Sequence, residues 1–238
     1  MKENKIWNDY LPEDMQEHWT VYECLKESED SSTFLVKETV TGILCVLKWG
    51  RNRRAEFLRN EMEIMEKMAD RKLSGVPKAY RIFEENGEVY LVREYIEGMS
   101  LAQMVLQKGG ISEAEICRIS RKICQTAEQF QNPDEPMIHR DIKPENIVVT
   151  PGGEVVFIDF GTMRSYKKDG SRDTFVVGTR GTAAPEQYGY TQTDQRTDVY
   201  AIGQTMLYMV SESYEMNQLS ECAVSRRMKK DNREGLLF

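Results

Sequence analysis

The fold and the chemistry of this chain are decided by one stretch of sequence, His139-Arg140-Asp141-Ile142-Lys143-Pro144-Glu145-Asn146. The segment Asp159-Phe160-Gly161 follows after a short apolar run. From Asp141 to Asn146 the first segment places an acid, a base and a carboxamide within six residues, and Asp159 in the second segment adds a further acid. Such a set can orient a hydroxyl group, neutralise a phosphate and hold a divalent metal ion.

Each polar side chain in the first segment suits one of these tasks. Asp141 is the candidate base, which accepts the proton of an attacking hydroxyl or orients it. Lys143 lies two residues on, so it points to the same side of an extended loop and can meet a phosphoryl group. Asn146 offers a neutral oxygen to a metal ion. His139 is expected to support the backbone of this loop and neither to bind metal nor to transfer protons.

The second segment follows the apolar run Val155–Ile158, which reads as a strand. A carboxylate at the end of a buried strand can chelate Mg²⁺, so Asp159 is the second candidate metal ligand. Phe160 is expected to pack beneath it, and Gly161 lets the chain turn.

Length and composition restrict the class of protein. The 238 residues suffice for one two-lobed domain or two small ones, and 40% hydrophobic with 30% charged residues describes a globular protein. The net charge of -7 argues against a nucleic-acid partner. No apolar run reaches the ~20 residues of a membrane span.

The five cysteines show no metal-binding spacing. Cys117 and Cys124 lie seven residues apart in a helical stretch, so we expect them to share a face in the core. The odd number of cysteines and the lack of a signal sequence indicate a cytoplasmic protein.

The first part of the chain predicts a five-stranded sheet with one helix. Residues 1–18 form a lead-in that is expected to pack loosely on the first strand. Residues 54–69 carry helical periodicity, and Asn86-Gly87 predicts a hairpin. The expected strands are 19–25, 33–38, 43–49, 79–84 and 89–94.

Helices dominate after the linker Glu97-Gly98. They are expected at 100–108, 112–131 and 198–210, and Ser112 with Glu115 forms a capping box at the start of the second. Residues 148–150 and 155–158 predict a short hairpin, and residues 162–183 a polar loop.

In their order and spacing, these motifs resemble the catalytic core of protein kinases. Cys45-Val46-Leu47-Lys48 is similar to the family's Val-Ala-Ile-Lys strand, and Ala184-Pro185-Glu186 to its Ala-Pro-Glu motif. Asp198 opens a segment similar to Asp-x-Trp-Ser-x-Gly. Lys143 favours the serine/threonine branch. The sequence of residues 178–187 resembles the corresponding segment of bacterial kinases of the eukaryotic type.

The resemblance implies an α+β, two-lobed protein-kinase-like fold with ATP between the lobes. The N-lobe, residues 19–97, would hold a five-stranded antiparallel sheet and one helix, and the C-lobe, residues 98–238, would be mainly helical. The family usually continues with more helices than the residues after Val210 allow, so the C-lobe is expected to be shortened. In the family Asp198 anchors the catalytic loop, and Glu186 pairs with a distant arginine, for which Arg226, Arg227 and Arg233 are the candidates.

Lys48 is expected to form the family's ion pair with an acid of the following helix. Helical phase favours Glu61, because this residue begins an apolar stripe that continues through Met65 and Met68. Glu56 and Glu63 are the competing acids.

The resemblance also assigns the nucleotide site, with Mg²⁺ held by Asn146 and Asp159. The backbone of Glu94, Tyr95 and Ile96 would meet adenine, and Glu97 would lie near the ribose. Val46 belongs to the same site. Arg93 would guard the back of the pocket, where the family mostly has an apolar residue.

Two departures from the family pattern concern phosphate and substrate binding. Residues 26–33 contain no glycine where the family has Gly-x-Gly-x-x-Gly, and Glu27, Glu29 and Asp30 add negative charge there. Ser28 and Ser31 could still offer hydrogen bonds to phosphate. Thr182 replaces a residue that is often larger in the family's substrate-binding segment.

The resemblance implies regulation by phosphorylation. Arg140 would bind a phosphate on the loop that follows Gly161. Thr174 is the first choice of phosphosite, with Ser171 and Ser165 as alternatives, and self-association would allow autophosphorylation.

Three functions compete on these grounds. The first is a serine/threonine protein kinase that acts on protein hydroxyl groups. The second is a pseudokinase or nucleotide-binding scaffold, which the glycine-free loop suggests and the intact Lys48, Asp141 and Asp159 oppose. The third is a small-molecule kinase, whose loops usually lack the Lys143-Pro144-Glu145 context.

Overall fold

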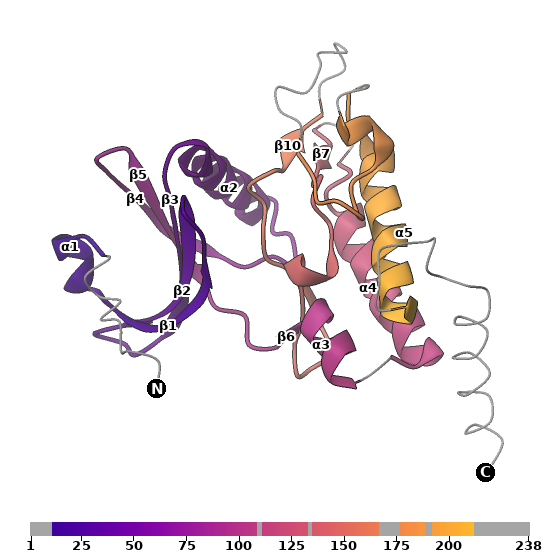
Figure 1. Ribbon diagram of the computed structural model, residues 1–238, viewed down its shortest axis with the longest axis horizontal. Coiled ribbons are helices and arrows are strands. Elements are labelled where there is room, and N and C mark those ends of the chain that lie inside the picture. Colours follow the sequence, from indigo (N-terminus) through magenta and orange to yellow (C-terminus); the bar gives the residue numbers. More distant parts are fainter. Residues whose placement is uncertain (1–10, 109–110, 133–134, 167–176, 189–191, 212–238) are drawn as a thin grey trace. The chain divides into compact units, whose positions relative to one another are not determined.

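The computed structural model describes residues 11–108, 111–132, 135–166, 177–188 and 192–211 (Figure 1). The chain divides into two compact units. The first comprises residues 1–72 and 77–96, and the second comprises residues 73–76 and 97–238. The first unit is built around one sheet, and the second contains helices and two small sheets.

The first unit contains the expected antiparallel sheet of five strands, in the order β1-β2-β3-β5-β4 (Figure 1). The prediction of five strands and one long helix is therefore confirmed. The strand bounds are β1 (Trp19–Glu27), β2 (Ser31–Glu38), β3 (Leu44–Gly50), β4 (Ala79–Glu85) and β5 (Glu88–Glu94).

The strands extend closer to their turns than hydrophobic alternation predicts. β1 and β2 stay paired as far as Glu27 opposite Ser32, in polar sequence. β4 and β5 stay paired to Glu85 opposite Glu88, across Asn86 and Gly87, which have the positive φ of 52° and 82° that such a turn requires. Backbone hydrogen bonds thus continue where side-chain burial has already ended.

Helix α2 (Arg53–Asp70) packs against β3, β4 and β5. Its buried face includes Leu58, Met65 and Met68, and Glu61 lies in the same stripe at 1% exposure. The sheet residues Val89 and Leu91 pack against this face. The helix therefore places an acid inside the first unit at the position that helical phase predicts.

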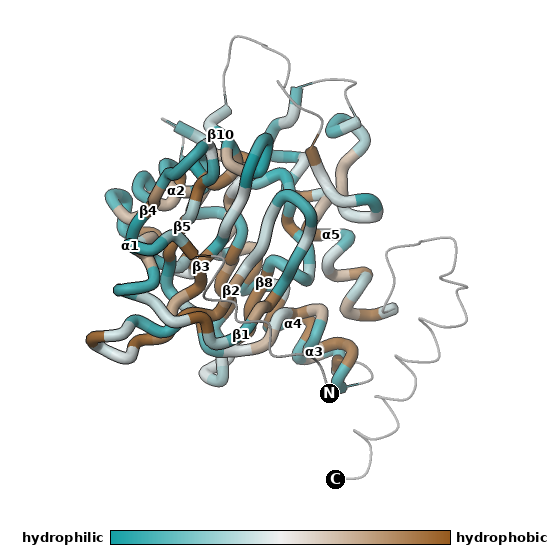
Figure 2. Tube along the Cα trace, turned by 60° about the vertical axis from the view of Figure 1, so that its left-hand side comes forward, coloured by the Kyte–Doolittle hydropathy of each residue, from teal (hydrophilic) through white to brown (hydrophobic). Residues whose placement is uncertain are grey.

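The opposite face of the sheet holds the larger apolar cluster. Phe34, Leu47 and Val92 are fully buried there or nearly so, and Figure 2 marks the hydrophobic residues of β3 in brown. Leu11 and Met15, the latter in helix α1 (Glu13–Gln16), join this cluster at 4% and 0% exposure. The expected loose packing of the lead-in is wrong for these described residues, because both apolar side chains are part of the core.

The second unit is built on three longer helices, α3 (Leu101–Lys108), α4 (Glu113–Glu128) and α5 (Gln195–Ser211). Ser112 caps α4 as predicted, since its Oγ accepts a hydrogen bond from the Glu115 backbone. α4 ends three residues before the predicted end, and Phe130 beyond it is fully buried. α5 begins three residues before the predicted start, at Gln195.

Short strands complete the second unit. The predicted hairpin is present as β8 (Ile147–Val149) and β9 (Val155–Phe157), and β6 (Met99–Ser100) extends it to three strands. β7 (Met137–Ile138) pairs with β10 (Arg164–Ser165). Sequence patterns did not predict β6, β7 and β10, because two residues are too few to show a period.

The predicted burial of Cys117 and Cys124 is wrong. Both side chains are exposed, and both thiols are free. The buried face of α4 instead carries Ile119, Ile123 and Ala127. The two cysteines do share a helical face, as seven-residue spacing requires, but that face is turned to solvent. Within the described residues, no helix is both long enough and apolar enough to cross a membrane.

Candidate active site

The loop that carries Asp141 begins directly after β7 and is held by a side chain from a distant helix. The backbone N–H groups of His139 and Arg140 donate to the two carboxylate oxygens of Asp198, at 2.8 and 2.9 Å. Asp198 lies in the first turn of α5 and is 2% exposed. The prediction that Asp198 anchors this loop is confirmed. Burial raises the pKa of Asp198 to about 6, against the opposing effect of its two backbone donors.

His139 is a core residue of the loop. It is fully buried, and its ring lies 5.4 to 6.3 Å from the rings of Phe130, Phe157 and Phe160. Its Nδ1 accepts a long hydrogen bond of 3.4 Å from the Asp141 backbone. Burial lowers the pKa of His139 to about 4, so the ring is neutral near pH 7. The predicted backbone-supporting role agrees with this contact.

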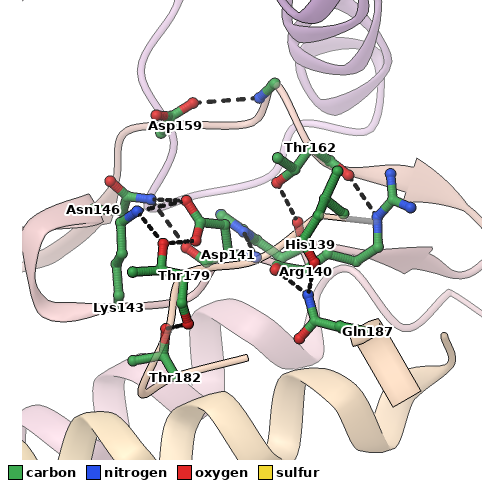
Figure 3. A network of polar contacts seen from close by, with 12 residues as sticks. His139, Arg140, Asp141, Lys143, Asn146, Asp159, Thr162, Thr179, Thr182 and Gln187 are labelled. Atoms are coloured by element: carbon green, nitrogen blue, oxygen red, sulfur yellow. Dashed lines mark hydrogen bonds and ion pairs between the residues drawn. The ribbon is translucent and has the colours of Figure 1, made fainter. Parts of the chain in front are cut away.

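Asp141, Lys143 and Thr179 form a closed triangle of polar contacts (Figure 3). Lys143 Nζ donates to Asp141 Oδ2 at 2.8 Å and to Thr179 Oγ1 at 2.7 Å. The Thr179 hydroxyl in turn donates to Asp141 Oδ1 at 2.7 Å. The Asp141 and Lys143 side chains are 13% and 18% exposed. The carboxylate is thus tightly oriented but still accessible to solvent.

Asn146 is oriented by the same carboxylate. Its Nδ2 donates to the backbone oxygen and to Oδ2 of Asp141, at 3.0 Å each. These bonds fix the amide so that Oδ1 points away from Asp141, and no donor from the described part of the chain contacts Oδ1. The amide oxygen is therefore available to a cation.

Asp159 follows β9 after one residue, as the sequence predicts, and Phe160 is fully buried beneath it. In the view of Figure 3, Asp159 lies above Asn146 on a separate segment of the chain. One oxygen of Asp159 accepts a 3.4 Å hydrogen bond from the Gly161 backbone. No cluster of three or more His, Cys, Asp or Glu side chains suited to a metal occurs among the described residues. A cation at Asn146 and Asp159 would therefore need oxygen ligands from a bound molecule or from water.

Two residues of this network were not predicted from sequence. Thr179 contacts both Asp141 and Lys143, and Gln187 donates to the Arg140 carbonyl at 2.6 Å. Their partners lie 36 to 47 residues away in the chain. The one sequence feature that points to Thr179 and Gln187 is their position in residues 178–187, a segment whose amino-acid sequence resembles that of kinases.

Thr182 and Glu186 flank these residues and have structural partners. Thr182 is 1% exposed, and its hydroxyl contacts the Thr179 carbonyl at 3.3 Å. Glu186 accepts a 2.7 Å hydrogen bond from the buried Thr197 hydroxyl. The arginines expected to pair with Glu186 (Arg226, Arg227 and Arg233) lie outside the described residues.

The residues expected to act in regulation are only partly described. Arg140 has a positive φ of 68°, and its Nε donates to the Thr162 carbonyl at 2.6 Å. The alternative phosphosite Ser165 donates to Glu135 at 2.9 Å. Thr174 and Ser171 lie outside the described residues.

In the first unit, the predicted ion pair between Lys48 and Glu61 is present. Lys48 Nζ lies 2.7 and 2.8 Å from the two carboxylate oxygens, and the side chains are 11% and 1% exposed. The competing acids Glu56 and Glu63 are both exposed, and Glu63 pairs with Lys67 on the same helix.

The turn between β1 and β2 is closed by its own polar groups. The Ser28 backbone and hydroxyl both donate to the Ser31 carbonyl, and the two hydroxyls lie 2.8 Å apart. Asp30 accepts hydrogen bonds from Arg51 Nε at 2.9 Å and from Asn52 Nδ2 at 3.2 Å. Side-chain contacts therefore shape a turn that glycines shape in the family pattern.

The segment expected to meet adenine follows the end of β5. Glu94 accepts a hydrogen bond from the Lys78 backbone through its carboxylate, and its own carbonyl accepts one from Arg93 Nη1 at 2.9 Å. Arg93 and Val46 are both 4% exposed and pair across β5 and β3. Ile96 is half-buried.

Comparison with known proteins decides the family. The sequence model of the family described as protein kinase domain matches residues 20–233, which is most of the chain. The chain belongs to the protein kinase family. The five-stranded sheet with its one long helix, α2, agrees with this assignment, and so does the order of the motifs.

The kinase is similar to several curated bacterial proteins. It is 32% identical over 164 residues to serine/threonine-protein kinase D of Synechocystis sp. The aligned region covers 66% of this chain and 31% of that protein. It is 30% identical over 164 residues to serine/threonine-protein kinase PknA of Nostoc sp. (66% and 28%). It is 34% identical over 125 residues to the probable serine/threonine-protein kinase PknB of Corynebacterium glutamicum (51% and 19%). The chain thus spans at most about a third of the length of these relatives.

Proposed function

We propose that this kinase transfers the γ-phosphoryl group of ATP to a serine or threonine hydroxyl of a protein substrate. The observation that carries the proposal is the arrangement around Asp141, where Lys143 and Asn146 fix a partly accessible carboxylate. Protein catalysis of phosphoryl transfer consists mainly of positioning and charge neutralisation, which such a set supplies.

In the proposed reaction, Asp141 receives the substrate hydroxyl and accepts its proton as the oxygen attacks the γ-phosphorus. The bond between the γ-phosphorus and the bridging oxygen breaks, and ADP leaves. Lys143 Nζ, already bound to Asp141, is the cation placed to meet the transferred group. The substrate hydroxyl would bind the same carboxylate as the Thr179 hydroxyl, which donates to Asp141 Oδ1.

Mg²⁺, when bound, would neutralise the negative charge of the nucleotide phosphates. The residues that fit it are Asn146, whose amide oxygen is turned away from Asp141, and Asp159 at the end of β9. Both offer the hard oxygen ligands that Mg²⁺ prefers.

The first unit supplies the proposed nucleotide contacts. Lys48, oriented by the buried Glu61, would contact phosphate, and Val46 would line the base site. The backbone of Glu94 and Ile96 would meet adenine, and the Glu94 carbonyl already accepts one bond from Arg93. Ser28 and Ser31 are weaker candidates for phosphate binding, because their hydroxyls and the Ser28 N–H bond within the turn.

The domain division and the setting of the enzyme are further parts of the proposal. We place the lead-in at residues 1–18 and the two lobes at 19–97 and 98–238, and the division of the compact units after Ile96 supports this boundary. A cytoplasmic location is supported by the free thiols of the four described cysteines.

The decisive experiment measures transfer of labelled γ-phosphate from Mg-ATP to a generic protein substrate. We expect transfer by the unaltered chain and a loss of about 10²- to 10⁴-fold in Asp141→Asn, because the amide cannot accept the proton. Equal transfer by both proteins would refute catalysis at this site. Tight ATP binding without transfer would instead indicate a nucleotide-binding scaffold.

Regulation by phosphorylation of the loop between Gly161 and Gly178 is proposed with Thr174 as the target and Arg140 as its partner. Self-association would allow one copy to modify another. After incubation with Mg-ATP, mass spectrometry is expected to find phosphate within residues 162–179. Phosphate only elsewhere, or none, would contradict this part of the proposal.

A further inference from the structure

The residue before the catalytic Asp141 is held at both ends of its backbone. Arg140 has a φ of 68°, a left-handed conformation that costs energy for any residue except glycine. Its N–H donates to Asp198 at 2.9 Å, and its carbonyl accepts from Gln187 Nε2 at 2.6 Å. Two side chains from distant parts of the chain therefore stabilise the strained residue that leads into Asp141.

The Gln187 carboxamide makes two further bonds to the segment that carries Thr179. Its Nε2 also donates to the Val177 carbonyl at 2.9 Å, and its Oε1 accepts from the Ala184 N–H at 2.9 Å. The residue is 4% exposed, so these bonds are shielded from water. One side chain thus spans both ends of residues 177–184 and joins them to the loop that carries Asp141, and Figure 3 shows Gln187 beside Arg140.

We infer that Gln187 is a positioning residue for the transfer step, an inference that rests on the proposed function. Thr179 and Asp141 share a 2.7 Å hydrogen bond, but they belong to segments 38 residues apart. Gln187 fixes the distance between these segments through Val177 on one side and Arg140 on the other. It therefore sets the orientation of the Asp141 carboxylate without touching substrate.

A substitution at Gly178 offers a second way to disturb the bonds of the Gln187 carboxamide. A Cβ atom at this position would lie 2.8 Å from Gln187 Nε2 and 2.7 Å from the Ala183 Cβ, at a φ of +138°. The absence of a side chain at Gly178 thus provides the space that Gln187 occupies. Gly178→Ala is expected to displace the carboxamide while leaving every polar group of the site in the sequence.

The test compares Gln187→Glu and Gln187→Met with Gln129→Glu. Glutamate at 187 keeps an acceptor for the Ala184 N–H but loses both N–H donors, and methionine loses all three bonds without adding charge. Gln129 is the matched control, because its carboxamide accepts from the Ser74 N–H at 2.9 Å and donates to the Ser74 carbonyl at 3.3 Å within the same unit.

Both Gln187 variants are expected to lower kcat by about 10- to 100-fold, the effect of a small misplacement of catalytic groups. The Kd for nucleotide should change by less than about 2-fold, since Gln187 does not contact the proposed nucleotide ligands. Gln129→Glu should retain kcat. An unchanged kcat in Gln187→Met, or a weakening of Kd that matches the loss of kcat, would overturn the inference.

A double variant separates positioning from general damage. Thr179→Ala with Gln187→Met is expected to be no more than about 2-fold slower than the slower single variant, because both act through the alignment of Asp141. Losses that multiply would show that the two residues act independently, and would overturn the inference.

Amide hydrogen exchange supplies a readout that needs no activity. Gln187→Met and Gly178→Ala should speed exchange in peptides that cover 137–146 and 177–188, whereas Gln129→Glu should not. Unchanged exchange in both variants would overturn the inference. If the unaltered chain transferred no phosphate, the proposed function would fail, and exchange would still test whether Gln187 joins the two segments.

Discussion

The ion pair between Lys48 and Glu61 is buried, with side chains that are 11% and 1% exposed. A buried pair is costly to break, because the remaining charge has lost both its partner and its hydration. Nucleotide binding is the proposed use of Lys48. Stability and function therefore depend on the same contact, and different variants can separate them.

Lys48→Met is expected to lower the free energy of unfolding by about 3 to 5 kcal/mol, since the buried Glu61 carboxylate would lose both of its bonds to Lys48. The double variant with Glu61→Leu should recover most of this loss but not nucleotide binding. Urea unfolding and nucleotide titration measure the two effects. Lys67→Met is the control, because its pair with Glu63 is exposed and contributes less than about 1 kcal/mol.

His139 and Asp198 titrate in opposite senses. The pKa of His139 falls from 6.5 to about 4, so the unfolded chain binds more protons in this range, and stability is lost as the pH falls from 6.5 to 4. The pKa of Asp198 rises from 3.8 to about 6, so the folded chain binds more protons, and stability is gained as the pH falls from 6 to 3.8. The two effects oppose each other between about pH 4 and 6.

His139→Phe should remove one of these two effects, and an aromatic ring suits a site surrounded by three phenylalanines. Relative to the unaltered protein, the variant is expected to gain up to about 3 kcal/mol of stability as the pH falls from 6.5 to 4. Urea unfolding at several pH values measures this difference. A difference that is independent of pH would show that His139 does not remain neutral in the folded state.

At the scale of elements, the short sheet β6-β8-β9 depends on one close backbone approach. Gly98, just before β6, has a φ of +152°, and a Cβ there would lie 2.4 Å from the Val149 carbonyl oxygen. β6 pairs with β8 at this point, and β8 follows Asn146 directly. The position of Asn146, a candidate metal ligand, therefore depends on Gly98, although Gly98 has no side chain that could take part in the site.

Gly98→Ala is expected to lower the stability of the second unit by more than about 2 kcal/mol, because backbone must move to make room. Gly153→Ala is the matched control, with a φ of +74° and a close contact only to the Arg118 guanidinium, which can move aside. The control should cost about 1 kcal/mol of backbone strain. Urea unfolding compares them, and equal losses would show that the contact with Val149 is unimportant.

At the scale of the whole molecule, nucleotide binding should be visible as added stability. ATP with Mg²⁺ at 100 times its Kd would stabilise the folded chain by about 2.7 kcal/mol. For a chain of this size that corresponds to a rise in Tm of about 5 to 10 °C. EDTA should remove most of the rise, because the phosphates would lose their counter-ion.

Two variants assign this effect to the site. Asp159→Asn should abolish the dependence on Mg²⁺, since it removes the charged metal ligand. Asp141→Asn should retain the rise, because Asp141 is proposed to act on the hydroxyl group. If Asp141→Asn also lost the rise, the proposed separation of the two acids into base and metal ligand would be wrong.

Most elements of the fold could be predicted from sequence, because burial imposes a local period on a strand or helix. α2 is the clearest case, where the phase of its apolar stripe identified Glu61 as the inward acid. The same reasoning failed for Cys117 and Cys124, since a shared face does not say which face is covered. The expected loose packing of the lead-in was wrong for a different reason, because the burial of Leu11 and Met15 depends on a sheet formed by later residues.

The chemical groups that lie close along the chain could be assigned from the sequence. Residues 139–146 place Asp141, Lys143 and Asn146 on one loop, because hydrogen bonds within a few residues fix their relation. Only the folded chain brings Thr179 and Gln187 into contact with this loop. Those contacts span 36 to 47 residues, and no local period encodes which distant hydroxyl or carboxamide will meet a given carboxylate or carbonyl. They follow from the path of the whole chain, which only packing specifies.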